Sequence, residues 1–150
     1  MKRNNPNHRS AIRAIWPAAA VASLLGCALP GQPTADVGTE LVEKLDLASF
    51  RNSTGPGREA GKHRFADYGF RVVGRSGSRT RLTTTNGDWV MGFDVLNVSD
   101  TSVTLCFFDV AHNGGTYRAT TALLVKRDHS SLWKATEIKA GFPGCSSEAG

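Results

Sequence analysis

Between Asp36 and Ala48, apolar residues recur at intervals of three and four, the spacing of one face of an α-helix, and charged residues occupy the other faces. Asp36 precedes the pattern and is the predicted N-cap, while the segment 52–57 (NSTGPG) is rich in helix-breaking residues and ends it. We therefore expect one short amphipathic helix. Its apolar face is carried by Val37, Leu41, Leu45 and Ala48.

From Tyr68 onward, apolar and polar residues alternate, which is the period of a β-strand with one buried face. Turn residues separate the alternating runs, for example at 74–77, 112–115 and 128–131. The pair Asn86-Gly87 is the strongest hairpin signal, because a two-residue type I′ turn needs positive φ at both central positions. The predicted strands cover 68–73, 79–84, 89–95, 103–110, 117–125 and 132–138, followed by a tail in loop conformation.

One helix followed by about six strands with short connections predicts an antiparallel meander. Such a sheet buries one face, and the single helix is the element available to cover it, so the expected fold is a two-layer α+β domain with a curved sheet. A helix packed on a curved antiparallel sheet that ends in a strand such as 132–138 resembles the nuclear-transport-factor-2-like and cystatin-like groups of folds. This resemblance concerns shape and implies no activity, because both groups host many functions.

The first 26 residues have the layout of a secretory signal peptide. Lys2, Arg3, Arg9 and Arg13 precede an uncharged stretch, 14–26, and no acidic residue occurs before Cys27. The stretch is too short to cross a bilayer, which takes about 20 apolar residues.

The uncharged stretch ends in Leu24-Leu25-Gly26-Cys27, which resembles the lipobox of bacterial lipoproteins. The resemblance implies cleavage after Gly26 and lipid attachment to Cys27. Residues 1–26 are then the leader, 27–35 a lipidated cysteine with a Pro- and Gly-containing tether, and 36–150 one domain. Ala28 is not the aspartate associated with inner-membrane retention, which favours an outer membrane facing the periplasm. The alternatives are an uncleaved helix and a freely secreted protein.

The charge balance changes when the leader is removed. The chain of 150 residues has 18 Lys and Arg against 13 Asp and Glu, a formal charge of +5. Four of the basic residues lie in the leader and no acidic residue does, which leaves the mature chain at +1. The basic footprint of a nucleic-acid-binding domain is therefore absent from the overall balance, and we expect no nucleic-acid partner.

Cys106 and Cys145 remain once Cys27 carries lipid, and an even pair in an exported domain predicts a disulfide. The alternative is a reactive Cys106 thiol with His112 as its base. The apolar surroundings of Cys106 in the sequence (TLCFF) favour a buried, unreactive sulfur.

Seven basic residues and only two acidic ones lie between Arg58 and Arg81, whereas 82–117 contains no Lys or Arg. The basic segment is a candidate site for an anionic partner such as lipid headgroups or an acidic protein. The alternative is that these charges protect edge strands from pairing and are neutralised by the acidic segment. The residues assigned to the anionic-partner site are Arg64, Arg71, Arg75, Arg79 and Arg81.

Asp109, His112 and Tyr117 surround a predicted turn and form a candidate acid/base cluster for an envelope hydrolase or transferase. Turn hydrogen bonding is the competing role for these residues. The histidines lack metal-ligand spacing, no phosphate-binding glycine loop follows a strand, and we expect no metal or cofactor. The large aromatic residues are expected in the core, with a cavity for a small apolar ligand as the alternative.

Two classes of function follow. The first is a membrane-anchored, non-enzymatic binding or assembly module, and an inhibitor or immunity protein is a narrower form of it. The second is an enzyme that uses the cluster of Asp109, His112 and Tyr117. The sequence favours the binding module, whose partner would be an envelope protein or a small apolar ligand.

Overall fold

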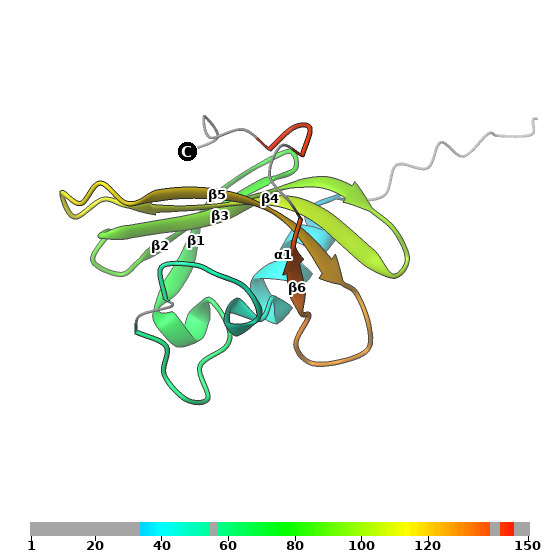
Figure 1. The fold of residues 1–150 in the computed structure, drawn as a ribbon, viewed down its shortest axis with the longest axis horizontal. Helices are drawn as coiled ribbons and strands as arrows, with labels where there is room; N and C mark the ends of the chain where they lie inside the picture. The colour runs from blue at the N-terminus through cyan, green and yellow to red at the C-terminus, as the bar shows by residue number, and fades with distance from the viewer. Residues whose placement is uncertain (1–33, 55–56, 139–141, 146–150) are drawn as a thin grey trace, which may run out of the picture. The chain divides into compact units, whose positions relative to one another are not determined.

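Six antiparallel strands form one open sheet in which each strand pairs with the next along the chain (Figure 1). This confirms the predicted meander and a sheet-rich fold with little helix in the described part of the chain. The strands are β1 (Phe70–Ser76), β2 (Arg79–Thr84), β3 (Trp89–Val98), β4 (Ser102–Ala111), β5 (Arg118–Lys126) and β6 (Ala135–Glu137).

The computed structural model describes residues 34–54, 57–138 and 142–145. The predicted leader, Cys27 and the tether up to residue 33 lie outside the described residues. Helix α1 (Thr34–Lys44) begins two residues before Asp36, so Asp36 lies inside the helix and the N-cap prediction is wrong.

The helix also ends earlier than its apolar spacing predicts. Leu45 leaves the helix to form a parallel bridge with Trp133, and the Trp133 N–H donates to the carbonyl of Lys44 at 2.7 Å. The Asp46 carboxylate then accepts a hydrogen bond from the Ala48 N–H and caps a separate 3-10 helix, Leu47–Ser49. A tertiary contact therefore interrupts a pattern that still has helical periodicity.

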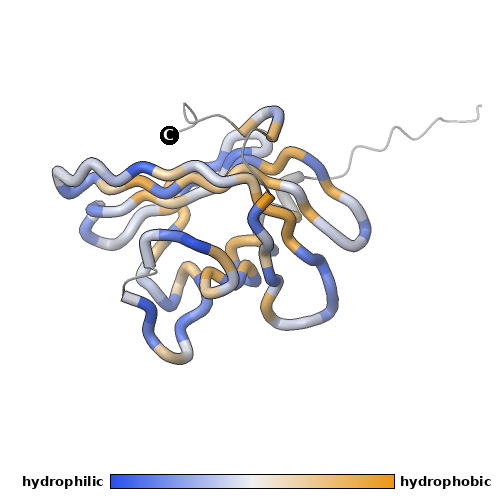
Figure 2. Tube along the Cα trace, in the orientation of Figure 1, coloured by the Kyte–Doolittle hydropathy of each residue, from blue (hydrophilic) through white to orange (hydrophobic). Residues whose placement is uncertain are grey.

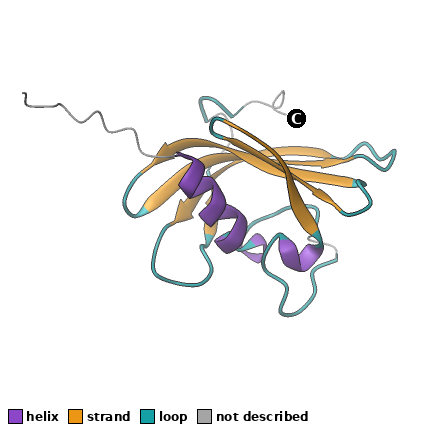
Figure 3. Cartoon of the chain, turned by 180° about the vertical axis from the view of Figure 1, so that it is seen from behind, coloured by secondary structure: helices purple, strands orange, loops and turns teal. Residues whose placement is uncertain are grey.

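Residues of α1 and of the sheet share one hydrophobic core. Val37, Leu41 and Leu45 are at most 3% exposed and belong to the same buried cluster as the alternate residues of β3 and β4. Figure 3 shows α1 lying along one face of the sheet, and Figure 2 shows hydrophobic residues concentrated on the strands and on the segments beneath them. We call this face the inner face. In the predicted strand 89–95 the alternate residues Trp89, Met91, Phe93 and Val95 do point toward the core, with Trp89 at its partly exposed margin.

Several predicted strand limits are wrong. Tyr68 belongs to a 3-10 helix, Ala66–Tyr68, and β1 starts only at Phe70, after Gly69 has turned the chain with φ of 76°. The strand then runs through Gly74, where a turn was predicted, because a bulge between Val72 and Gly74 absorbs one extra residue. The turn to β2 lies at Gly77 and Ser78.

The predicted two-residue turn at Asn86-Gly87 is a four-residue connection, 85–88, in which Gly87 has φ of 79° and Asn86 bonds to Asp88. The last predicted strand, 132–138, is longer than the observed strand β6, which covers only Ala135–Glu137. Its first part is used by Trp133 for the bridge to Leu45.

The other face of the sheet, here the outer face, carries the intervening residues of β4, including Cys106 and Phe108. Phe108 is 1% exposed and lies over Gly92 on β3, where an added Cβ atom would be 2.3 Å from Phe108 Cζ. Gly92 is therefore required by the close approach of this ring.

Candidate functional site

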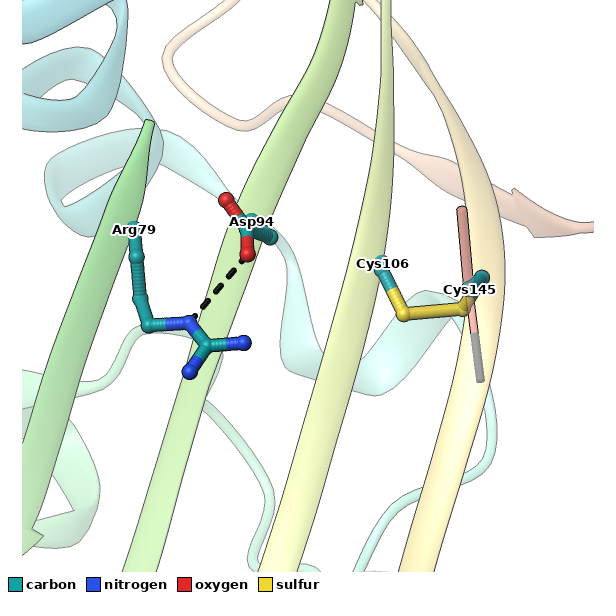
Figure 4. Close-up of a disulfide and its surroundings, with 4 residues drawn as sticks. All are labelled: Arg79, Asp94, Cys106 and Cys145. Carbon is teal, nitrogen blue, oxygen red and sulfur yellow. Dashed lines mark hydrogen bonds and ion pairs between the residues drawn. A yellow bond between two sulfur atoms is a disulfide. The ribbon is translucent and has the colours of Figure 1, made fainter. Parts of the chain in front are cut away.

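The predicted disulfide is present between Cys106 of β4 and Cys145, which lie 39 positions apart in sequence and whose Cα atoms are 5.2 Å apart (Figure 4). It attaches residues 142–145 to the outer face of the sheet. The alternative of a reactive Cys106 thiol paired with His112 is wrong, because the sulfur is bonded to Cys145.

Of the five arginines assigned to an anionic-partner site, Arg71, Arg79 and Arg81 share the outer face by strand register, whereas Arg64 and Arg75 do not. Arg79 lies on the outer face beside Asp94 of β3, and its Nε is 3.2 Å from Asp94 Oδ2 (Figure 4). Arg75 pairs in register with the core-facing Thr80 and donates to Thr39 of α1 at 2.8 Å. Arg64 precedes β1, where its backbone N–H bonds to Asp67. Arg71 and Arg81 remain exposed, on β1 and β2.

Of the three acid/base candidates, Asp109 and Tyr117 lie together and His112 lies apart from them. Asp109 and Tyr117 both lie toward the inner face, at the end of the sheet where the Trp89 and Tyr117 rings meet edge to face at 5.6 Å. His112 follows the last residue of β4, is exposed, and uses its backbone N–H to bond to the carbonyl of Asp88. No hydrogen bond or ion pair in the described part of the chain joins the His112 ring to Asp109 or Tyr117.

Asp109 is only 1% exposed, and its Oδ2 atom accepts a hydrogen bond from the Ser53 N–H at 2.5 Å. Its Oδ1 atom is buried and has no hydrogen-bond partner in the described region. Burial raises the pKa of this carboxyl, against the opposing effect of the Ser53 hydrogen bonds. The pKa of Tyr117 is also raised, first by burial and then by the charge of Asp109.

A polar groove that the sequence does not indicate lies at the other end of the sheet, between α1, the β3–β4 turn and the β5–β6 connection. Its volume is about 640 Å³, within the range of small-molecule sites. Three segments far apart in sequence build it, so no local motif marks it. The lining residues are Glu40, Lys44, Asp100, Thr101, Arg127, Asp128, His129 and Trp133.

Trp133 is 1% exposed and two cations lie over its ring. Lys44 Nζ is 4.9 Å and the Arg127 guanidinium 5.8 Å from the ring centroid, which is cation–π range. Glu40 holds both cations, with Oε1 at 3.3 Å from Lys44 Nζ and Oε2 at 3.2 Å from an Arg127 nitrogen. One carboxylate thus fixes two basic groups against an indole.

The acidic side of the groove comes from the two connections. The backbone N–H of Arg127 donates to the carbonyl of Thr101 at 2.8 Å. This hydrogen bond holds the β3–β4 turn, which contains Asp100, beside the start of the β5–β6 connection. Asp128 accepts hydrogen bonds from Ser130, and these hold the pKa of its carboxyl below the usual value. The groove therefore has three carboxylates and two cations, and its chemistry is that of charge recognition.

The core aromatic residues pack against one another in the interior. Phe107 meets Phe50 at 4.9 Å and Phe65 at 6.5 Å, and all three are at most 5% exposed. Within the described residues, no group of three or more His, Cys, Asp or Glu is placed to hold a metal ion. The same residues contain no helix with the length and apolar character needed to cross a membrane.

We compared the chain with known protein families, curated proteins and solved structures. No family model, no curated protein and no solved structure matches the chain.

Proposed function

We propose that this protein is a lipid-anchored, non-enzymatic binding module of a bacterial envelope, held by Cys27 in the outer membrane and facing the periplasm. The lipobox-like sequence at 24–27 supports the anchor, and the disulfide is in keeping with an oxidising compartment. In this proposal α1 and the sheet form a two-layer α+β domain that presents the groove. An envelope protein remains a proposed partner for the exposed Arg71 and Arg81.

The groove is the observation that carries the proposal. Its charged groups are already fixed by each other and by the Trp133 ring, so a ligand binds them without the full entropic cost of ordering long side chains. In the described part of the chain, no hydrogen bond or ion pair connects His129 to a nucleophilic side chain or to a carboxylate.

The second candidate is an envelope hydrolase or transferase at Asp109 and Tyr117. It is favoured by one observation, the buried Oδ1 atom without a partner next to a tyrosine. His112 is absent from this cluster, which leaves the candidate with two of the three acid/base groups that the sequence suggested.

The test is capture followed by chemical analysis. Protein purified in detergent from membranes of its host is incubated with an extract of envelope small molecules, and retained compounds are identified by mass spectrometry. The proposal expects a compound that is released chemically unchanged and is no longer retained by Arg127→Gln. Lys134→Gln is the matched control, because Lys134 is exposed and does not line the groove. Conversion of the compound, or equal retention by Arg127→Gln, would contradict the proposal.

A further inference from the structure

We propose that the groove binds a small zwitterion, with an anionic group on Lys44 and Arg127 and an ammonium group on Asp100 and Asp128. This inference rests on the proposed function as a binding module and assigns the chemical class of its ligand.

The two cations retain donors for an anionic group. Each of them makes one ion pair with Glu40, whereas a lysine ammonium has three N–H donors and an arginine guanidinium has five. Their side chains are 34% and 28% exposed, so the remaining donors reach the groove while their stems stay packed. A carboxylate or phosphate bound there receives charge-assisted hydrogen bonds from donors that are already in place.

The acidic residues supply the complementary half. Asp100 is exposed and forms no hydrogen bond or ion pair in the described part of the chain. Asp128 lines the same groove, and its ion pair with Lys126 is long, with Nζ at 3.5 Å from Oδ2. Asp100 and Asp128 therefore offer an ammonium group two carboxylates that no buried cation neutralises.

The balance of charges excludes ligands of one sign. A purely anionic ligand meets the three carboxylates of the groove, and a purely cationic ligand meets Lys44 and Arg127. A molecule with both charges satisfies both halves at once. The volume of about 640 Å³ accommodates a headgroup-sized zwitterion with room for further atoms.

The indole of Trp133 provides a readout located at the site, because its Nε1–H donates to the carbonyl of Asp128 at 3.0 Å. The protein, labelled with ¹⁵N-tryptophan and purified in detergent from membranes of its host, is titrated with phosphoethanolamine, with phosphate and with ethanolamine. We expect phosphoethanolamine to shift the Trp133 indole signal in a saturable way and the Trp89 signal to stay unchanged. Phosphate and ethanolamine, which each carry charge of only one sign, should bind at least about tenfold more weakly than phosphoethanolamine.

Two variants test the two halves. Asp100→Asn should weaken phosphoethanolamine binding about fivefold or more and leave phosphate binding no weaker, whereas Arg127→Gln should weaken both. Glu43→Gln and Lys134→Gln remove exposed charges outside the groove and should change neither affinity. Dialanine is a second zwitterion. A stronger response to dialanine indicates a peptide source, and a stronger response to phosphoethanolamine a lipid headgroup, and either supports the inference.

A Trp133 signal that no zwitterion moves, or one that phosphate or ethanolamine alone moves equally well, overturns the inference. If Arg127→Gln fails to fold, the comparison of probes on the unaltered protein and on Asp100→Asn still decides. Capture of an unchanged ligand without opposite charges would remove this inference and leave the proposed binding function standing.

Discussion

Asp109 places a carboxyl group in the buried inner face of the sheet. A carboxylate that is 1% exposed and hydrogen-bonded through one oxygen is destabilised relative to its neutral form, and burial accordingly raises its pKa. The folded protein therefore holds this proton more tightly than the unfolded chain does. As the pH rises from the ordinary aspartate pKa through the raised value, the folded state loses stability.

Replacement of Asp109 by Asn should raise the free energy of unfolding at neutral pH by roughly 1 kcal/mol. The amide keeps an acceptor for the Ser53 N–H and carries no buried charge. The gain should disappear below the ordinary aspartate pKa of about 3.9, where the wild-type carboxyl is also neutral in the unfolded chain. Denaturant unfolding between pH 3 and pH 8 measures this. Asp100→Asn is the control from an exposed position, and a gain for Asp109→Asn that is the same at every pH would refute the account.

Gly92→Ala should destabilise the sheet by roughly 2–3 kcal/mol, because the new Cβ would lie 2.3 Å from Phe108 Cζ and 2.3 Å from the carbonyl oxygen of Thr80. Gly74→Ala is matched to it. Gly74 also lies in a strand, and its added Cβ meets no atom within 4 Å, so little change is expected. Equal thermal unfolding temperatures for the two variants would show that Phe108 does not pack on Gly92 as described.

At the scale of elements, the disulfide joins the central strand β4 to the C-terminal segment. Removing it by Cys145→Ser should lower the free energy of unfolding by up to about 4 kcal/mol, the chain-entropy value for a loop of about 40 residues. The measurement is the urea midpoint of each protein with and without reductant. Reductant should lower the wild-type midpoint to that of Cys145→Ser and leave the variant unchanged. A wild-type midpoint insensitive to reductant, with both thiols open to labelling, would contradict the bond.

The strand order was predictable because an alternating pattern marks each strand separately and short connections leave few topologies. The residues at which the helix and the strands end were not predictable in the same way. Leu45 still fits the helical spacing, but its bridge to Trp133 is a contact between residues 88 positions apart, which periodicity does not encode. The bulge at Val73 likewise depends on pairing with β2, so a strand was predicted to end where it continues.

The groove shows the same limit. Glu40 and Lys44 have the spacing of an ordinary surface ion pair on a helix, and nothing near them in sequence points to Arg127 or Trp133. Asp109 and Tyr117 flank the turn that the sequence predicts, and they do lie close together in the structure. His112 does not join them, because it follows the last residue of β4, where the chain leaves the sheet. Sequence proximity predicted two members of that cluster and misplaced the third.

For the whole molecule, the prediction with the largest effect concerns Cys27. Cys27→Ser should abolish acylation and lower the recovery of the protein in the membrane fraction of its host, because the lipid is the proposed anchor. Fractionation with a metabolic fatty-acid label detects both changes. Cys145→Ser is the control, since it also removes a cysteine and should leave membrane recovery intact. Unchanged membrane recovery of unlabelled Cys27→Ser would exclude a lipid anchor at this position.

The intact mass of the protein isolated from membranes of its host tests the central claim most directly. The account predicts a chain that begins at Cys27, has lost residues 1–26, and carries the added mass of fatty-acyl groups on that cysteine. A chain of unmodified mass that retains Met1 through Gly26 would contradict the anchor, and with it the proposal of a binding module held at the envelope membrane.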